Sequence, residues 1–404
     1  MLFEGVTLGN LRLPNRLVRS ATYEGMADET GAPEPGLADL YGRLAANDVG
    51  MIVTGFCFIA AEGRASQPRQ CGMDAEHKVA PWSRIVAAVK DRHPGTALVM
   101  QLAHAGRQTL ASAAGGRPVG ASSRPSPFFG GRPRSLRDAE ISAILRAFAD
   151  AADRARRAGF DGVQLHAAHG YLIHQFLRPD INRRRDRWGR DRDAFLLEAI
   201  RAVKERCGDR FPVLLKVSAR DGVLEPEDVG DLLRRLEPDG VDAVEISTGT
   251  MDRPFEIFRG GVPARLALRH NPLYKDRPEW AKRLWLKTRY KSVARRFPPF
   301  REEYNRADAA AIRSRTGLPL ILVGGLRSAA SMETILRNGE AEAVSLCRPL
   351  IREPDLGRRI REGSTPGSSC RNCNVCAVMC DSRRPLRCYA PKTGTAASIQ
   401  EVIR

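Results

Sequence analysis

Two histidines and a tyrosine stand within six residues, directly after a short apolar run. The run, residues 163–165, predicts a buried strand that ends on His166, and His169 and Tyr171 follow it. Imidazole and phenol groups donate and accept protons in catalysis, and a barrel of parallel strands has its catalytic face at the carboxyl ends of those strands. We therefore predict that these three residues are catalytic.

Two other interpretations fit the same segment. A His-x-x-His pair could bind a metal ion, but zinc sites on helices use histidines at i and i+4, and no glutamate stands beside this pair to act as a base. A buried tyrosine can also be a packing residue whose hydroxyl is satisfied. Three polar rings on one turn favour a catalytic role over packing alone.

The rest of the chain alternates apolar runs with amphipathic segments. The predicted strands are residues 17–20, 51–55, 97–102, 163–165, 212–217, 243–246, 319–323 and 343–346. The predicted helices are residues 37–46, 82–92, 136–158, 194–206, 226–236, 306–315, 329–337 and 353–362. Eight strands each followed by a helix predict an α/β fold of the (β/α)8 TIM-barrel type. We expect a barrel over residues 1–365, with an insertion at about 250–305 between strands six and seven, and a cysteine-rich tail over 366–404.

The ends of the last two predicted strands suggest a phosphate site. Gly324 and Gly325 follow strand seven, and Cys347 and Arg348 follow strand eight. Glycine amides approach an oxygen closely because no Cβ intervenes, and a guanidinium binds phosphate through two parallel hydrogen bonds. These are the strand ends at which barrels bind phosphate, so we predict an anion site there.

Five of the nine cysteines lie between Cys370 and Cys388. Cys370, Cys373, Cys376 and Cys388 form a C-x2-C-x2-C-x11-C ladder, and Cys380 is a fifth thiol outside it. Four thiolates at this spacing bind a [4Fe–4S] cluster or one Zn²⁺; free or structural thiols are the third interpretation. We predict the four ladder cysteines as metal ligands, on a segment that can fold back over the catalytic face.

Composition excludes several classes of protein. The 404 residues carry a formal net charge of +18, from 65 Lys and Arg against 47 Asp and Glu. The basic residues are spread along the chain, so we expect no specific nucleic-acid partner. No apolar run follows a basic amino terminus and no span approaches bilayer length, so we expect no membrane association and a cytoplasmic location.

The motif around Tyr171 resembles the old yellow enzyme family, the FMN-dependent ene-reductases. It reads His-Ala-Ala-His-Gly-Tyr-Leu-Ile-x-x-Phe-Leu-x-Pro from His166 and continues as Asn-Arg-Arg-Arg-Asp-Arg-Trp-Gly over residues 182–189. The run Gln-Leu-x-His-x-Gly-Arg from Gln101 matches a second family motif. In this family the histidine pair binds the oxygen of an activating carbonyl and the tyrosine protonates a substrate carbon, so the resemblance implies these roles here.

The resemblance also implies an FMN site at the strand ends. An amide such as Gln101 suits the N3–H and carbonyl edge of the flavin, and a cation such as Lys216 would stabilise negative charge at N1 and C2–O. The alternative for Lys216 is a surface lysine paired with Asp221. The expected cofactor-binding residues are Ala21, Thr22, Gln101, Lys216, Gly324, Gly325, Cys347 and Arg348.

The cysteine tail resembles the iron–sulfur branch of the same family, the 2,4-dienoyl-CoA reductases and trimethylamine dehydrogenase. That branch carries a Cys-Ile-Gly-Cys-Asn-x-Cys turn, and its [4Fe–4S] cluster passes single electrons to the FMN beside it. The resemblance implies such a cluster here.

These features predict an oxidoreductase that transfers hydride from NAD(P)H through FMN to an electron-poor alkene such as an α,β-unsaturated carbonyl. No Gly-x-Gly-x-x-Gly turn occurs, so the nicotinamide must share the substrate site. The alternative is an electron-transfer subunit that exchanges electrons between FMN and the cluster with a partner flavoprotein. The expected partners are the unsaturated carbonyl, NAD(P)H and either a second copy of the chain or that flavoprotein.

Overall fold

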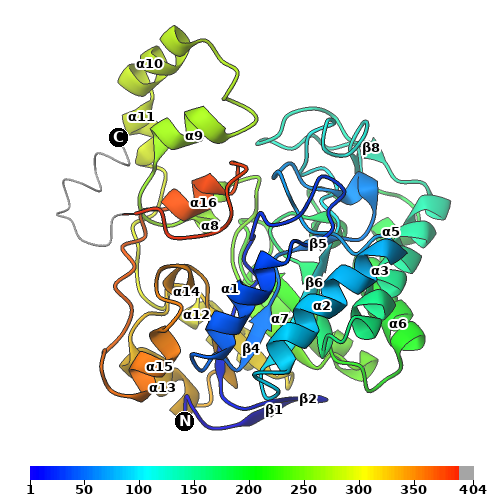
Figure 1. Cartoon of the computed structure of the whole chain (residues 1–404). Coiled ribbons are helices and arrows are strands. Elements are labelled where there is room, and N and C mark those ends of the chain that lie inside the picture. The colour runs from blue at the N-terminus through cyan, green and yellow to red at the C-terminus, as the bar shows by residue number, and fades with distance from the viewer. Residues whose placement is uncertain (391–404) are drawn as a thin grey trace.

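Eight parallel strands close into a barrel in the computed structural model of the chain, which describes residues 1–390 (Figure 1). They are β3 (Leu17–Arg19), β4 (Met51–Val53), β6 (Ala97–Ala103), β9 (Gly162–Ala167), β10 (Val213–Ser218), β11 (Ala243–Ser247), β12 (Leu320–Val323) and β13 (Ala343–Leu346). Each pairs with the next, and β13 returns to pair with β3, so this ring has no free edge. The predicted TIM barrel is confirmed, with every predicted strand within two residues of its expected bounds.

A layer of helices surrounds the strands. It contains α1 (Gly36–Ala45), α2 (Val79–Lys90), α3 (Asp138–Arg157), α6 (Ala194–Cys207), α7 (Pro226–Leu236), α12 (Arg306–Arg313), α13 (Ala329–Arg337) and α15 (Leu356–Arg361). Their apolar faces are buried, as Ile141, Leu145 and Phe148 show for α3. The predicted helix at 353–362 is shorter, because Pro354 lacks an amide hydrogen and separates α15 from the short α14 (Arg348–Arg352).

Short elements complete the barrel. The antiparallel pair β1 (Val6–Leu8) and β2 (Leu11–Leu13) packs its leucines against the apolar side chains at the amino ends of the barrel strands. The loops at the opposite end contain β5 (Cys57–Phe58), β7 (Val119–Gly120), β8 (Arg134–Ser135), α4 (Leu172–Leu177) and α5 (Arg187–Arg190). One end of the barrel is therefore closed by leucines, and the carboxyl end is left for function.

An insertion follows β11, as predicted for residues 250–305. It contains α8 (Pro254–Ile257), α9 (Ala264–His270), α10 (Glu279–Thr288) and α11 (Tyr290–Ala294). Helices α9 to α11 project beyond the barrel (Figure 1). No residue of 271–300 is buried, and Trp280 on α10 is 71% exposed.

The cysteine tail crosses the carboxyl end of the barrel. Its one helix within the described residues, α16 (Val375–Met379), packs against α9 of the insertion. Beyond that helix the Leu386 amide donates to the carbonyl of Glu24 at 2.8 Å, and Arg383 pairs with Glu29. The tail therefore joins the insertion to the loop after β3.

No helix within residues 1–390 is long and apolar enough to cross a membrane. The division of the chain into a barrel over 1–365 and a tail over 366–404 stays a prediction. Residues 391–404 of that predicted tail lie outside the described part of the chain.

Candidate active site at the carboxyl end of the barrel

The three predicted catalytic side chains meet at the end of β9. The ring of His166 lies edge to face with both others, with centroids 5.1 Å from His169 and 4.8 Å from Tyr171. Phe56 packs against Tyr171 with 5.4 Å between centroids, and its ring also lies 6.3 Å from that of His166. His166 and Tyr171 are buried and His169 is half-buried. The structure thus brings together the three groups that the spacing indicated.

Burial sets the protonation state of these groups. It lowers the pKa of His166, and the charges of His169 and Lys216 lower that pKa further. Burial likewise lowers the pKa of His169 and raises the pKa of Tyr171. At neutral pH the site therefore offers two neutral imidazoles and one protonated phenol.

Neighbouring chain segments fix the two imidazoles. Nδ1 of His166 accepts the amide N–H of Ala168 at 3.4 Å, which places the proton of the neutral ring on Nε2. His169 shares a 2.8 Å hydrogen bond between its Nε2 and Oγ of Ser247, at the end of β11. The His169 amide donates to Oγ of Ser218, at the end of β10, at 3.1 Å. Three adjacent strands therefore position the pair.

A buried histidine outside this group holds the turn between His169 and Tyr171. His174 accepts the amide N–H of Gly170 on Nδ1 at 2.8 Å, and its Nε2 lies 3.0 Å from Oδ2 of Asp221. Burial raises the pKa of Asp221, but the interactions with His174, the charge of Arg178 and the amide of Leu224 together outweigh it, and the pKa falls to about 2. Gly170 has a φ of +81°, and a Cβ there would lie 2.4 Å from Oγ1 of Thr250, so the turn requires glycine.

A hydrogen-bonded chain runs through the barrel between two predicted cofactor residues. Gln101 Nε2 donates to Gln164 Oε1 at 2.7 Å, and Gln164 Nε2 donates to Glu245 Oε2 at 3.0 Å. Lys216 Nζ donates to the same Glu245 oxygen at 2.9 Å and to Ser20 Oγ at 2.7 Å. Lys216 is therefore a buried lysine with a glutamate counter-ion, and the alternative of a surface pair with Asp221 is wrong.

The first and last barrel strands meet through Thr22 and Cys347. Thr22 Oγ1 lies 2.8 Å from the carbonyl oxygen of Ser20 and 3.2 Å from Cys347 Sγ. Ala21 packs against the apolar interior of the barrel. Three of the predicted cofactor residues therefore share one edge of the catalytic face.

The predicted glycines after β12 adopt conformations that favour glycine. Gly324 and Gly325 have φ values of +137° and +79°. A Cβ on Gly324 would lie 2.5 Å from Nδ2 of Asn305, and one on Gly325 would lie 2.8 Å from Cδ1 of Tyr304. Both glycines therefore pack closely under the end of the insertion.

Guanidinium groups surround the same corner. Arg348 donates to the carbonyl of Arg259 at 3.0 Å and to Oδ1 of Asn374 in the tail at 2.6 Å. Arg259 stacks on Tyr304, 4.0 Å from the ring centroid. Within the described residues, Nε of Arg259 and Nη2 of Arg327 are buried without a hydrogen-bond partner. Buried donors of this kind are satisfied when an anion binds between them.

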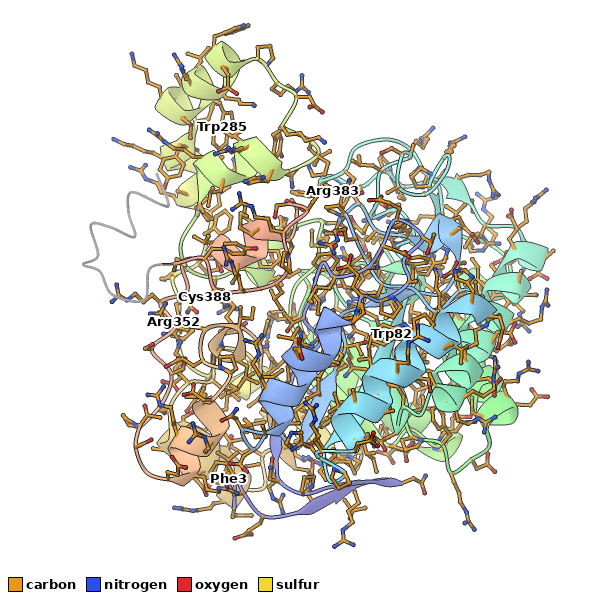
Figure 2. The ribbon with its side chains drawn as sticks, viewed as in Figure 1. Phe3, Trp82, Trp285, Arg352, Arg383 and Cys388 are labelled. Atoms are coloured by element: carbon orange, nitrogen blue, oxygen red, sulfur yellow. The ribbon has the colours of Figure 1, made fainter. Side chains whose placement is uncertain are left out.

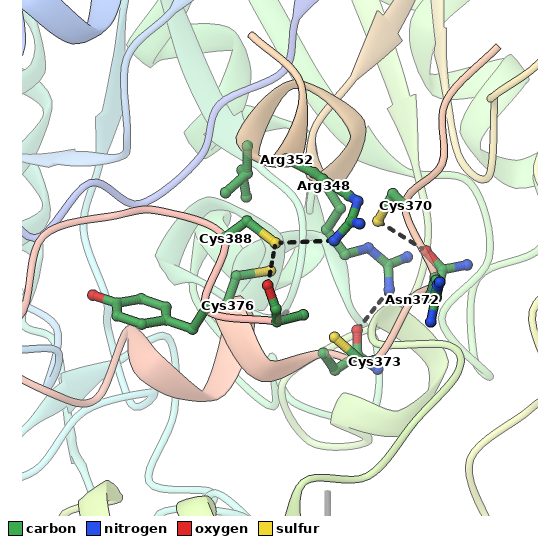
Figure 3. Close-up of a pocket in the computed structure, with 12 residues that line it drawn as sticks. Arg348, Arg352, Cys370, Asn372, Cys373, Cys376 and Cys388 are labelled. Atoms are coloured by element: carbon green, nitrogen blue, oxygen red, sulfur yellow. Dashed lines mark hydrogen bonds between the residues drawn. The ribbon is translucent and has the colours of Figure 1, made fainter. Parts of the chain in front are cut away.

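The four ladder cysteines line one cavity beside that corner (Figure 3). Arg348, Arg352 and Arg371 line it too, and Arg352 Nη1 donates to Cys388 Sγ at 3.6 Å. The cavity has a volume of about 20 Å³, room for a single water molecule. Among residues 1–390, no three Cys, His, Asp or Glu side chains converge closely enough to bind one metal ion.

The sequence profile of one family, described as the NADH:flavin oxidoreductase / NADH oxidase family, matches residues 1–248 of the chain. The chain belongs to this family. The prediction of an NAD(P)H:flavin oxidoreductase is therefore confirmed at the level of the family, which implies FMN as the cofactor and NAD(P)H as the reductant.

Curated relatives of this flavin oxidoreductase family differ in length. NADPH dehydrogenase of Geobacillus thermodenitrificans is 31% identical, and the match covers 88% of this chain and 92% of that protein. NADH oxidase of Thermoanaerobacter brockii is also 31% identical over 94% of this chain, but the match spans only 53% of that protein. A metal reductase of Desulforamulus reducens is 28% identical over 90% of this chain and 49% of its own length. The chain thus spans about half the length of two of these relatives.

Solved structures of two reductases share the barrel. Morphinone reductase in complex with tetrahydroNAD superimposes with a TM-score of 0.70 at 25% identity, over 91% of this chain and 92% of that one. A 2-naphthoyl-CoA reductase gives a TM-score of 0.80 at 20% identity, over 96% of this chain and 56% of that one, which supports the fold alone.

The residues present suit FMN. The orphaned donors of Arg259 and Arg327 flank the glycines and Arg348, where the resemblance implies the phosphate. Gln101 and Lys216 lie near the histidine pair on adjacent strands, since Lys216 stands beside His166 in the sheet register. Sequence reasoning missed Gln164, Glu245, Arg259 and Tyr304. The first two stand as polar residues inside apolar runs, a signal that could have found them; the last two lie in an insertion without such a pattern.

Proposed function

We propose that the chain transfers hydride from NAD(P)H, through FMN, to an electron-poor alkene such as an α,β-unsaturated carbonyl. The observation that carries the proposal is the contact between His166, His169 and Tyr171 at the catalytic face. Bound FMN would supply the redox chemistry, because it accepts hydride from the nicotinamide and gives it to the β-carbon of the alkene.

The histidine pair binds the carbonyl oxygen of the alkene substrate. Because Nδ1 of His166 accepts the amide N–H of Ala168, its Nε2–H can donate to a ligand. Ser247 engages Nε2 of His169, so Nδ1 of that ring faces a ligand. Two neutral donors stabilise the negative charge that develops on the oxygen as hydride arrives, without a charged imidazolium to desolvate.

Tyr171 delivers the proton to the α-carbon. Its raised pKa keeps the hydroxyl protonated until a strong base, the enolate-like carbon, forms beside it. Phe56 and His166, which also contact each other, hold the ring in place. The phenol then recovers its proton from solvent.

The residues assigned to FMN form two groups, one for the ring system of the cofactor and one for its phosphate. Gln101 and Lys216, the latter paired with Glu245, would hold the ring system, and Ala21, Thr22 and Cys347 would line one edge. Gly324, Gly325 and Arg348, with Arg259 and Arg327, would bind the phosphate.

An anaerobic titration tests the proposal. The purified holoprotein should show flavin absorbance that NADH or NADPH bleaches, and 2-cyclohexenone should restore it with one equivalent of saturated ketone formed. Bleaching without recovery in cyclohexenone and in other activated alkenes would contradict the alkene acceptor, and absence of flavin would contradict the FMN site.

We further propose that Cys370, Cys373, Cys376 and Cys388 ligate a [4Fe–4S] cluster that exchanges single electrons with the flavin. The four thiols line one cavity, and the neighbouring guanidinium groups offset the negative charge of a thiolate-bound cluster. Because a cavity of about 20 Å³ holds no cubane, the tail must open around the thiols when the cluster forms.

A partner flavoprotein would supply or remove these electrons. Iron and acid-labile sulfide analysis after anaerobic preparation should give about four of each per chain. One zinc per chain, or no metal in a fully active enzyme, would overturn the cluster.

A further inference from the structure

A second cavity lies outside the catalytic residues, where the insertion, the tail and two barrel loops meet. Its volume is about 360 Å³, within the range of small-molecule sites. Arg269 and Lys275 come from the insertion, Asp381 and Arg383 from the tail, and Ser66 from the loop after β5. Figure 2 shows Arg383 at this junction. We call this cavity the junction pocket.

The walls of the junction pocket are basic. Arg269, Lys275 and Arg383 supply three cations against the one carboxyl group of Asp381. Arg383 is paired with Glu29, whereas no ion pair within residues 1–390 engages Arg269 or Lys275. These two cations are therefore available to an anionic ligand.

The Asp381 carboxyl group already accepts a hydrogen bond from a residue of the insertion. Nδ2 of Asn271 donates to its Oδ2 at 2.7 Å. His270 also lines the pocket, and burial lowers the pKa of its ring, so it adds a neutral donor or acceptor at neutral pH. The pocket keeps a net positive charge.

One residue of the pocket lining stands next in the chain to a residue that packs with Tyr171. Ser66 follows Ala65, and Ala65 packs in one buried cluster with Tyr171 and Ala105. After burial, the charge of Asp381 is among the influences that raise the pKa of Tyr171. A ligand in the pocket could therefore extend its other end to the catalytic face.

We propose that the junction pocket binds the phosphate groups of a nucleotide ligand whose reactive end lies at Tyr171. This inference rests on the proposed function for the identity of the reactive end. A dinucleotide reductant carries its phosphates on the far side of the nicotinamide, and a basic, serine-containing cavity of this size matches a nucleotide phosphate better than an uncharged tail. A coenzyme A thioester substrate carries the same adenosine diphosphate chemistry, and the site would accept it through the same contacts.

Calorimetric titration of the holoprotein with ADP tests the pocket without reference to turnover. The double variant Arg269→Ala/Lys275→Ala should weaken ADP binding by about tenfold or more, because each side chain contributes a charge-assisted hydrogen bond. The matched control is Arg283→Ala/Lys287→Ala, which removes two cations from α10 outside the pocket and should change the Kd by less than about twofold. Titrations with 2′,5′-ADP and 3′,5′-ADP separate the sources: preference for the first indicates NADPH, and for the second a coenzyme A thioester.

Two results would overturn the inference. One is ADP binding that the pocket variant and the control weaken equally, which would indicate general attraction to a basic surface. The other is no ADP binding by the wild-type holoprotein. If ADP binds as expected but NAD(P)H bleaches no flavin, the nucleotide site at the junction pocket is supported and the proposed function, with NAD(P)H as reductant, is contradicted.

Discussion

His166 and Tyr171 meet edge to face across the end of β9, with their ring centroids 4.8 Å apart. Four residues separate them along the chain, and the strand-to-helix turn brings the phenol back to the imidazole. The Tyr171 amide donates to the carbonyl of Ala168, and the Leu172 amide donates to that of His104, which fixes this turn on the neighbouring loop. One short segment therefore carries both residues that we propose as the donor to an oxyanion and the acid for the adjacent carbon.

Removal of both imidazoles should abolish ligand recognition at this turn. Phenols give a long-wavelength charge-transfer band on the oxidised flavin in this family, and we expect His166→Ala/His169→Ala to lose it because the phenolate oxygen has no donors left. The measurement is an absorbance titration of the holoprotein with 4-hydroxybenzaldehyde. His93→Ala, outside the catalytic face, is the control. A double variant that keeps the band would show that the pair does not bind the ligand oxygen.

Loss of Glu245 should destabilise the barrel. Glu245→Gln leaves Lys216 buried without its counter-ion, so the free energy of unfolding should fall by about 3 kcal/mol. Urea denaturation followed by circular dichroism measures the change. The control is Glu279→Gln, which removes the pair between the exposed Glu279 carboxyl group and Lys282 and should leave the midpoint unchanged. An unchanged midpoint in both variants would show that the pair contributes nothing to stability.

The docking of the tail should weaken as pH rises. Burial raises the pKa of Asp381 to about 6, although the hydrogen bond from Asn271 opposes this shift. Because the folded pKa lies above the unfolded value of about 3.9, the stabilisation is fully present below pH about 3.9 and is lost as pH rises through 6. Hydrogen exchange, corrected for its intrinsic pH dependence, should show the Leu386 amide better protected at pH 5 than at pH 7.5.

Asp381→Asn should remove that dependence, because the amide does not titrate. The Leu386 amide of this variant would then be equally protected at both pH values. A variant that keeps the wild-type difference would assign the pH dependence to another group.

Ligation of the cluster should stabilise the folded conformation of the tail. Cys373→Ala should lose iron and sulfide and increase proteolysis between residues 366 and 390, since metal ligation contributes directly to folding. FMN should stay bound, because the guanidinium corner does not depend on this thiol. Cys380→Ala, outside the ladder, is the matched control and should keep its iron. Equal iron loss in both variants would contradict the proposed ligand set.

Local pattern was sufficient to predict the barrel and the proximity of His166, His169 and Tyr171. Each barrel strand is an apolar run buried on both faces, and the helices carry their apolar residues on one side, so both periods are visible in the sequence. His166, His169 and Tyr171 lie on one continuous segment, so their proximity needed no tertiary information.

Contacts between distant segments could not be predicted in this way. The partner of Lys216 is Glu245 rather than Asp221, because the parallel register places Lys216 opposite Glu245 while Asp221 turns toward His174. The place of Tyr304 between Gly325 and Arg348 depends on how the insertion folds back. No local propensity encodes either pairing.

The half-reactions of Tyr171→Phe test the central claim most directly. In stopped-flow experiments under nitrogen, we expect NAD(P)H to reduce the flavin of this variant at nearly the wild-type rate. Reoxidation by 2-cyclohexenone should be slower by about 10²-fold or more, the usual contribution of a general acid. Equal loss in both half-reactions, or undiminished reoxidation, would contradict the assignment of Tyr171 as the proton donor to an alkene.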